Sequence, residues 1–168
     1  MLTLQQVSDL YEIQLLKARF VRYMDTRSWD AWRELLADDL VYYIDEGPTP
    51  DSTTPTFTGA DALLAHQTSS DPGKVSIHQV HSPEIEFLDE NTATGVWAMF
   101  SWSDNPRRDF GLKQYGHYHD RYVRGADGKW RISSIHLTAL RRNAVDHLPS
   151  ERVDVVDKST LPSHTGGD

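Results

Sequence analysis

The sequence predicts one α+β domain in which helices cover one face of a strongly curved, mixed β-sheet and leave an open pocket. Helical periodicity is confined to residues 4–68, and long extended segments separated by short turns fill residues 75–142. Helices followed by antiparallel strands are typical of α+β domains with the helices on one side of the sheet. We expect the domain to span residues 1–147 and a polar C-terminal tail to follow at 148–168.

Three helices are predicted in the N-terminal part of the chain. An apolar stripe at helical spacing predicts the first over 4–24. The second is expected over 28–38, beginning at an N-capping serine. The third is expected over 58–68, because Thr58 and Asp61 have the spacing of a capping box.

The strands are predicted from period-two alternation and from the turns between them. A short strand is expected at Val41–Ile44, followed by a loop rich in proline and threonine. Four long strands are expected at 75–88, 91–103, 112–124 and 129–142, with a glycine-flanked hairpin turn between the last two. Strands this long in a small domain should bend, and a bent sheet closed by helices makes a concavity that holds small ligands.

The composition excludes several classes of protein and site. There is no cysteine, which excludes disulfides, thiolate metal sites and cysteine nucleophiles. The net charge of −8 disfavours nucleic acid as a partner, and no apolar run is long enough to span a membrane. The sequence has no glycine-rich phosphate loop, no G-x-S-x-G and no HExxH motif. We expect a cytoplasmic protein that acts on a small molecule.

Two titratable residues stand out by position. Asp25 lies at the C-terminal end of the first predicted helix, where the helix dipole disfavours a carboxylate. It is either a polar residue of the turn or an acid that projects into the pocket. His78 lies in the first long strand, where a lone histidine is more often a core or edge residue than a catalytic one.

Further histidines gather in the predicted sheet. His117 and His119 are two residues apart in one strand and therefore share a face, which could form half of a metal site, a polar lining of the pocket or a surface pair. His136 is also carried by a strand and could face the same interior. The residues alone leave these alternatives open.

Several segments together resemble the SnoaL-like branch of the NTF2-like superfamily. They are RFVRYMDTRSWDAWRELLADDLVYY (19–43), SIHQVHSPEIEF (76–87), NTATGVW (91–97) and YHDRYVRGADGKWRI (118–132). The likeness is nearest to the dehydratase and dehydrochlorinase members: scytalone dehydratase, bile acid 7α-dehydratase and hexachlorocyclohexane dehydrochlorinase. The resemblance implies a cone-shaped α+β fold and a catalytic Asp–His dyad, for which Asp25 and His78 stand at the matching positions. It also implies activity without a cofactor or metal, and a homo-oligomer, a trimer in preference to a dimer.

The sequence also departs from these relatives. Phe20 stands where the bile acid dehydratase has a helix tyrosine, and Ser101 and Ala139 replace polar residues of its later strands. His117 and His119 align roughly with polar pocket residues of scytalone dehydratase. These differences imply a different substrate.

The resemblance and the residue pattern together predict a cofactor-independent lyase that carries out a dehydratase-type elimination on a small, largely apolar cyclic substrate. In this prediction His78 is the general base and Asp25 orients its ring. The expected substrate contacts are Phe20, Tyr43, Trp97, Met99, Ser101, His117, His119 and His136.

Three alternatives share the predicted fold. The same dyad could serve an isomerase or a polyketide-cyclase-type enzyme. The chain could instead be a non-catalytic ligand-binding module, or the small subunit of a ring-hydroxylating dioxygenase, because the fold alone does not specify an enzyme.

Overall fold

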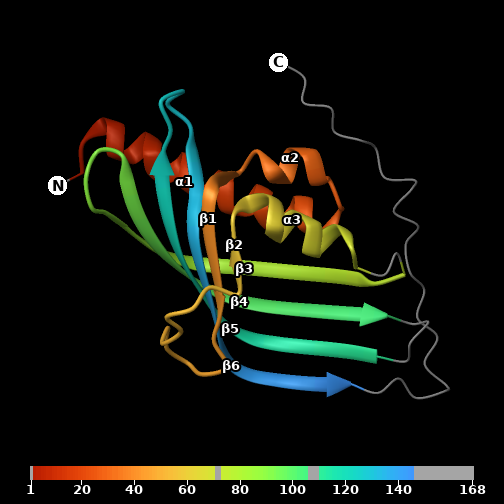
Figure 1. Cartoon of the computed structure of the whole chain (residues 1–168). Coiled ribbons are helices and arrows are strands. Elements are labelled where there is room, and N and C mark those ends of the chain that lie inside the picture. The colour runs from red at the N-terminus through yellow and green to blue at the C-terminus, as the bar shows by residue number, and fades with distance from the viewer. Residues whose placement is uncertain (1, 71–72, 106–109, 146–168) are drawn as a thin grey trace.

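The computed structural model describes residues 2–70, 73–105 and 110–145. In chain order its elements are α1 (Leu4–Asp25), α2 (Trp29–Arg33), β1 (Leu36–Ile44), β2 (Phe57–Thr58), α3 (Ala60–Thr68), β3 (Val75–Phe87), β4 (Thr92–Asn105), β5 (Phe110–Arg124) and β6 (Trp130–Val145) (Figure 1). The predicted C-terminal tail at 148–168 lies outside the described residues.

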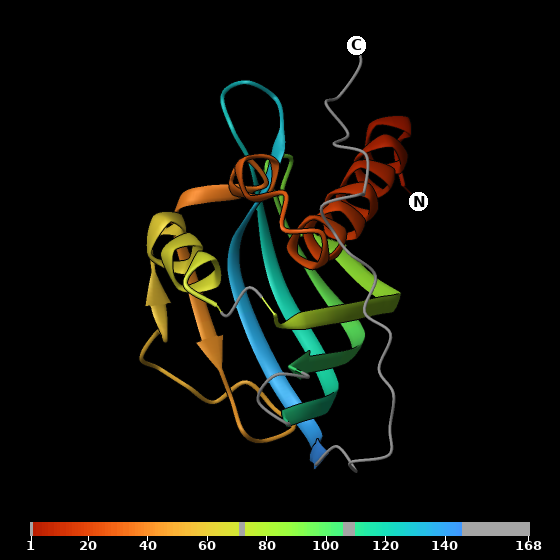
Figure 2. The same ribbon diagram turned by 90° about the vertical axis from the view of Figure 1, so that its right-hand side faces the viewer.

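Within the described ranges, six strands form one sheet in the order β2-β1-β6-β5-β4-β3. β1 and β6 are parallel, and the other neighbouring strands are antiparallel. The sheet bends strongly, and the three helices lie on one side of it, around the inner face of the bend (Figure 1, Figure 2). The predicted α+β architecture with helices around a curved, mixed sheet is confirmed.

The longest described helix, α1, begins with a capping box. The Thr3 hydroxyl accepts a hydrogen bond from the Gln6 backbone at 3.1 Å, and the Gln6 side chain accepts one from the Thr3 backbone at 3.0 Å. The buried stripe of α1 faces the sheet and consists mainly of Ile13, Leu16, Phe20 and Met24. None of the helices in the described ranges is long and apolar enough to cross a membrane.

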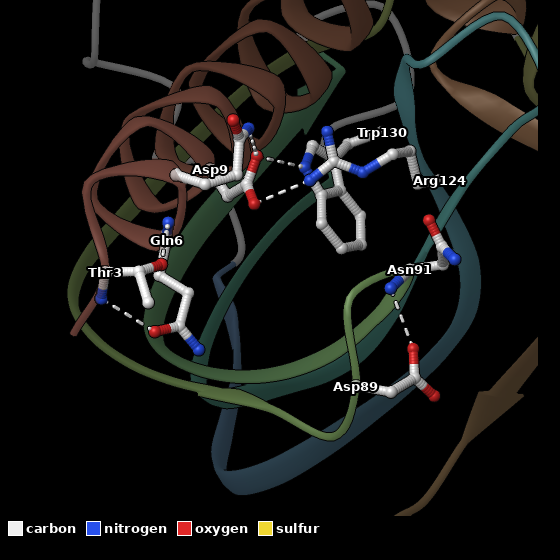
Figure 3. Close-up of polar contacts among 8 residues, drawn as sticks. Thr3, Gln6, Asp9, Asp89, Asn91, Arg124 and Trp130 are labelled. Carbon is white, nitrogen blue, oxygen red and sulfur yellow. Dashed lines mark hydrogen bonds and ion pairs between the residues drawn. The ribbon is translucent and has the colours of Figure 1, made fainter. Parts of the chain in front are cut away.

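Asp9 fixes the N-terminal half of α1 to the hairpin between β5 and β6 (Figure 3). Its carboxylate accepts a hydrogen bond from Trp130 Nε1 at 3.3 Å and pairs with Arg124 at 2.5 Å. Burial raises the pKa of Asp9, but the contacts with Arg124, Gln5 and Trp130 outweigh it and hold this pKa below its usual value. These contacts anchor the N-terminal half of α1, the helix that ends at Asp25.

The second helix is shorter than predicted. It ends at Arg33, and strand β1 begins at Leu36, which pairs with Ile132 of β6. Arg33 then binds Asp38 and Asp61, with nitrogen–oxygen distances of 2.6 Å to each. The segment expected to continue the helix gains sheet hydrogen bonds instead, so tertiary pairing overrides local helix propensity here.

The start of the third helix also differs from the prediction. Thr58 belongs to β2 and pairs with Val41, so Gly59 is the N-cap, with φ of +88°. Asp61 binds Arg33 rather than the start of the helix. The capping box expected from the spacing of Thr58 and Asp61 is therefore not formed.

Candidate active site

A cavity of about 200 Å³ lies between the helices and the inner face of the sheet. Its apolar lining comes from all three helices and from β5 and β6, and includes Phe20, Met24, Trp32, Leu63, Tyr118 and Leu137. Most of its polar lining comes from the adjacent strands β3, β4 and β5: Ser76, His78, Ser101, Ser103 and Gln114. Helix α3 adds His66 and Gln67, so the cavity presents a polar strip on the sheet and a second polar patch on this helix, with apolar surface between them.

Asp25 and His78 contact each other at this cavity through two hydrogen bonds. Oδ1 of Asp25 lies 2.6 Å from Nδ1 of His78, and Oδ2 accepts a hydrogen bond from the His78 backbone N–H at 2.8 Å. The exposed fractions of the two side chains are 20% and 14% respectively. The carboxylate thus holds both the ring and the backbone of the histidine.

The local sequence explains how residues 53 positions apart meet. Asp25 is the last residue of α1, and the chain turns sharply after it, with Arg27 in the left-handed region at φ of +58°. Arg27 donates a hydrogen bond to the carbonyl of Lys74 at 2.7 Å and so ties this turn to the segment that leads into β3. His78 then shares the inner face of β3 with Ser76 by strand alternation.

This geometry fixes the chemistry available to the ring. A carboxylate is an acceptor only, so Nδ1 of His78 must carry the proton that it donates to Asp25. In the neutral ring Nε2 is then the acceptor. Among the described residues none is hydrogen-bonded to that nitrogen, so it is available to take a proton from a bound molecule.

Two of the predicted substrate contacts, Phe20 and Ser101, line the cavity. Trp97 and Met99 share the inner face of β4 with Ser101, but each is only 4% exposed and belongs to the core. Trp97 donates from Nε1 to the Tyr122 hydroxyl at 2.8 Å. They pack behind the cavity and do not line it, and their predicted contact with a substrate stays a prediction.

The remaining predicted contacts lie on the outer face of the sheet. Because Gln114 and Tyr118 of β5 face the cavity, strand alternation turns His117 and His119 away from it. Tyr43 and His136 likewise alternate with the cavity-lining residues of β1 and β6. These four residues therefore do not line this cavity, and their role as substrate contacts stays a prediction.

The outer-face residues form a cluster of their own. His136 stacks on Tyr43 with ring centroids 3.9 Å apart, and Nε2 of His119 lies 3.3 Å from the Thr138 hydroxyl. The ring centroids of His117 and His119 are 6.1 Å apart. No group of three or more His, Asp or Glu side chains in the described part of the chain is arranged to hold a metal ion, so the possible metal half-site has no further ligand there.

His119 of this outer cluster and Asp45, whose carboxylate lies 3.5 Å from Nδ1 of His136, have shifted pKa values. Burial lowers the pKa of His119, and the neighbouring His117 and His136 lower it further. Asp45 is buried and accepts a hydrogen bond from the Ser52 backbone at 2.8 Å. Burial raises the pKa of Asp45, but hydrogen bonds from Ser52 and Asp51 outweigh it and bring the pKa to about 2.

Comparison with known proteins places this chain in a family. Residues 5–136 match the profile of the SnoaL-like domain. The chain belongs to the SnoaL-like domain family. The match includes the helix that carries Asp25 and the strand that carries His78.

Solved structures with a similar fold include a dehydrochlorinase and a protein named as a dehydratase. A type 2 hexachlorocyclohexane dehydrochlorinase, LinA, is 16% identical, with 90% of this chain and 99% of that chain covered and a TM-score of 0.73. A protein of Novosphingobium aromaticivorans provisionally named a scytalone dehydratase is 17% identical, with coverage of 89% and 98% and a TM-score of 0.67. The Kfla4162 protein of Kribbella flavida is 24% identical, with coverage of 82% and 95% and a TM-score of 0.70. At these identities the likeness shows a shared fold.

The structure of this SnoaL-like chain also brings into the cavity residues that sequence reasoning missed. Ser76, Ser103 and Gln114 lie on its polar strip, and Lys74 lines it as well. Burial lowers the pKa of Lys74, and the charge of Arg27 lowers it further. Strand alternation from His78 could have identified Ser76, whereas Gln114 becomes visible only once the pairing of β4 with β5 is known.

A buried ion pair supports the apolar side of the cavity. Lys17 of α1 and Asp120 of β5 are 2.6 Å apart, and both side chains are fully buried. Asp120 also accepts a hydrogen bond from the Tyr122 hydroxyl at 2.7 Å. The Lys17 ammonium lies 3.8 Å from the centroid of the Tyr118 ring, which lines the cavity. The pair therefore fixes α1 against β5 directly beside the cavity.

Proposed function

We propose that this protein is a cofactor-independent lyase that removes a proton from a small cyclic substrate with His78 and expels a leaving group such as water or chloride. The observation that carries the proposal is the 2.6 Å contact between His78 Nδ1 and Asp25 Oδ1 at the cavity. A histidine held in one tautomer, with its other nitrogen available, is suited to general-base catalysis.

Asp25 is the positioning residue of this pair. It holds the ring at Nδ1 and the backbone at the amide, so the imidazole cannot rotate or exchange tautomer without losing a hydrogen bond. After Nε2 has taken a proton, the adjacent carboxylate stabilises the imidazolium. Positioned proton transfer of this kind contributes about 10²–10⁴-fold to a reaction rate.

The similar structures favour elimination over other uses of such a base. The substrate of a dehydrochlorinase or a dehydratase loses a proton together with a leaving group. Proteins bearing these names share the fold. Family membership supports a small-molecule enzyme, and the cavity of about 200 Å³ suits a compact ring.

The proposal is tested with a panel of hydroxylated and chlorinated cyclic compounds, by mass spectrometry of the products. We expect a product that has lost water or hydrogen chloride, and a decrease in kcat/KM of about 10²–10⁴-fold in His78→Ala. His81→Ala is the matched control, because His81 lies in the same strand and is exposed.

Two results would count against elimination in this assay. Full turnover in His78→Ala would remove the dyad from the mechanism. A product of unchanged mass that depends on His78 would identify an isomerase that uses the same base.

A further inference from the structure

A lysine lines the cavity at the point where β3 begins. Lys74 directly precedes Val75, the first residue of β3, and lines the cavity together with Ser76 and His78. Strand alternation places these three residues on the same face. Because a strand rises about 3.3 Å per residue, Lys74 lies roughly 13 Å along the strand from His78. The lysine and the proposed base are therefore well separated within the cavity.

The charge of Lys74 is not balanced by a carboxylate in the described part of the chain. None of the described residues that line the cavity is Asp or Glu, and both oxygens of Asp25 contact His78. Arg27 donates a hydrogen bond to the Lys74 carbonyl at 2.7 Å, which brings a second cation close to the first. A half-buried ammonium normally has a counter-charge. We therefore expect the bound molecule to supply one.

The pKa of Lys74 agrees with this reading of its surroundings. Burial lowers this pKa, which means that the ammonium itself, and not only the aliphatic part of the side chain, is withdrawn from water. The charge of Arg27 lowers it further. An anion bound next to Lys74 would reverse both effects, because it favours the charged form of the amine.

Two serines stand next to this lysine on the polar strip. Ser76 of β3 pairs in register with Ser103 of β4, and both line the cavity. A carboxylate has two oxygens, each of which accepts more than one hydrogen bond. An ammonium group with two neighbouring hydroxyls is therefore a suitable set of donors for a carboxylate, and charge-assisted hydrogen bonds are the stronger kind.

The spacing indicates which part of a substrate this set of donors would meet. In an elimination the leaving group stands on the carbon next to the one that loses its proton, so it lies close to His78. Lys74 begins roughly 13 Å further along the strand. A position so far from the base suits a group at the remote end of the molecule, which anchors the substrate and takes no part in bond breaking.

We propose that Lys74, Ser76 and Ser103 form a carboxylate-binding subsite, so that the substrate is a cyclic carboxylic acid whose carboxylate lies at the end of the cavity away from His78. This inference rests on the proposed function and narrows its substrate class. The expectation of a largely apolar substrate is thereby refined to an apolar ring that carries one negative charge. A protein with a net charge of −8 repels anions, so a local cation is required to hold such a substrate.

A matched pair of probes tests the subsite without any turnover. Cyclohexanecarboxylate and cyclohexanecarboxamide have the same ring and nearly the same shape, and differ in charge. We expect the wild-type protein to bind the carboxylate at least about tenfold more tightly than the amide, as measured by NMR chemical-shift titration at neutral pH. In Lys74→Met this ratio should fall to about one or below, with the affinity for the amide retained. Lys74→Arg, which keeps the charge, should retain a preference for the carboxylate.

Lys113→Met is the matched control. Lys113 lies in β5 next to Gln114, so strand alternation turns it to the outer face, where its ammonium is 5.0 Å from the centroid of the Trp102 ring. This variant should keep the wild-type ratio. Retention of the ratio in Lys74→Met, or no preference for the carboxylate in the wild type, would overturn the proposal. Inorganic phosphate that binds as tightly as cyclohexanecarboxylate would show a site for any small anion, which would overturn the assignment of a carboxylic acid.

The outcome for the subsite is independent of the outcome for the base. His78→Ala should lose turnover and still prefer the carboxylate probe. On a carboxylated substrate, Lys74→Met should raise KM at least about tenfold with little change in kcat, because the carboxylate is bound equally in the ground state and the transition state. A preference that depends on Lys74, in a protein whose activity does not depend on His78, would refute the lyase mechanism and leave the subsite intact.

Discussion

Lys17 and Asp120 form an ion pair with a nitrogen–oxygen distance of 2.6 Å, and neither side chain is exposed to solvent. The pair joins α1, which ends at Asp25, to β5, which supplies Gln114 and Tyr118 to the cavity. Charges buried this deeply are tolerated because each neutralises the other, and removal of one leaves the other uncompensated.

We expect Lys17→Met to lower the free energy of unfolding by about 3–5 kcal/mol, because Asp120 would remain buried without its counter-charge. Urea denaturation at neutral pH measures this. The double variant Lys17→Met/Asp120→Asn should be more stable than Lys17→Met, since it removes the lone charge and keeps an acceptor for the Tyr122 hydroxyl.

The matched control for Lys17 is Arg131→Met. Arg131 pairs with Asp127 at 2.7 Å near the surface, with side-chain exposed fractions of 28% and 44%. Its loss should change the free energy of unfolding by less than about 1 kcal/mol. Equal effects of the two methionine substitutions would show that the buried pair is not important for stability.

Asp45 predicts a pH-dependent contribution to stability. Its pKa is about 2 in the folded protein, below the usual value near 3.8, so the unfolded chain binds more protons between these two pH values. Stability from this carboxylate is present above about pH 4 and is lost as the pH falls toward 2. At neutral pH we expect Asp45→Asn to be less stable than the wild type by about 2 kcal/mol.

The measurement for Asp45 is the free energy of unfolding of both proteins from pH 7 downward. The gap between them should narrow below pH 4. Glu46→Gln is a neighbouring control, because the Glu46 side chain is 90% exposed. A gap for Asp45→Asn that stays constant across this range would contradict the assigned pKa.

Gly116 marks a close approach between β5 and β6. A Cβ at this position would overlap the carbonyl oxygen of Thr138, which is backbone and cannot move aside. We expect Gly116→Ala to lower the free energy of unfolding by roughly 1–3 kcal/mol or more. Gly47→Ala, where a Cβ would meet nothing within 4 Å, is the control. Similar thermal stability of the two alanine variants would contradict this packing.

The parts of the fold that follow from local periodicity could be predicted from the sequence. The apolar stripe of α1 and the alternation of the long strands gave their positions, and the structure confirms these elements. The start of β1 could not be predicted, because Leu36 is ordered by pairing with Ile132, almost a hundred positions away. Only the assembled sheet supplies those hydrogen bonds.

The candidate site, like the fold, could be predicted only in part from the sequence. The positions of Asp25 and His78 were predicted, and the structure brings their side chains together. The outward direction of His117 and His119 was not predicted, because alternation shows that two residues share a face but not which face is inner. Asp120 is as polar as the histidines beside it, yet it faces inward, because Lys17 of α1 neutralises it there.

The central claim is tested most directly by the tautomer of His78, read from two-bond ¹H–¹⁵N correlations of its ring in the wild type and in Asp25→Asn. We predict that the neutral wild-type ring carries its proton on Nδ1 alone, and that the asparagine variant, which lacks the charged acceptor, shows a mixture of tautomers. A wild-type ring protonated mainly on Nε2, or a tautomer that is unchanged in Asp25→Asn, would contradict the pairing on which the proposed lyase depends.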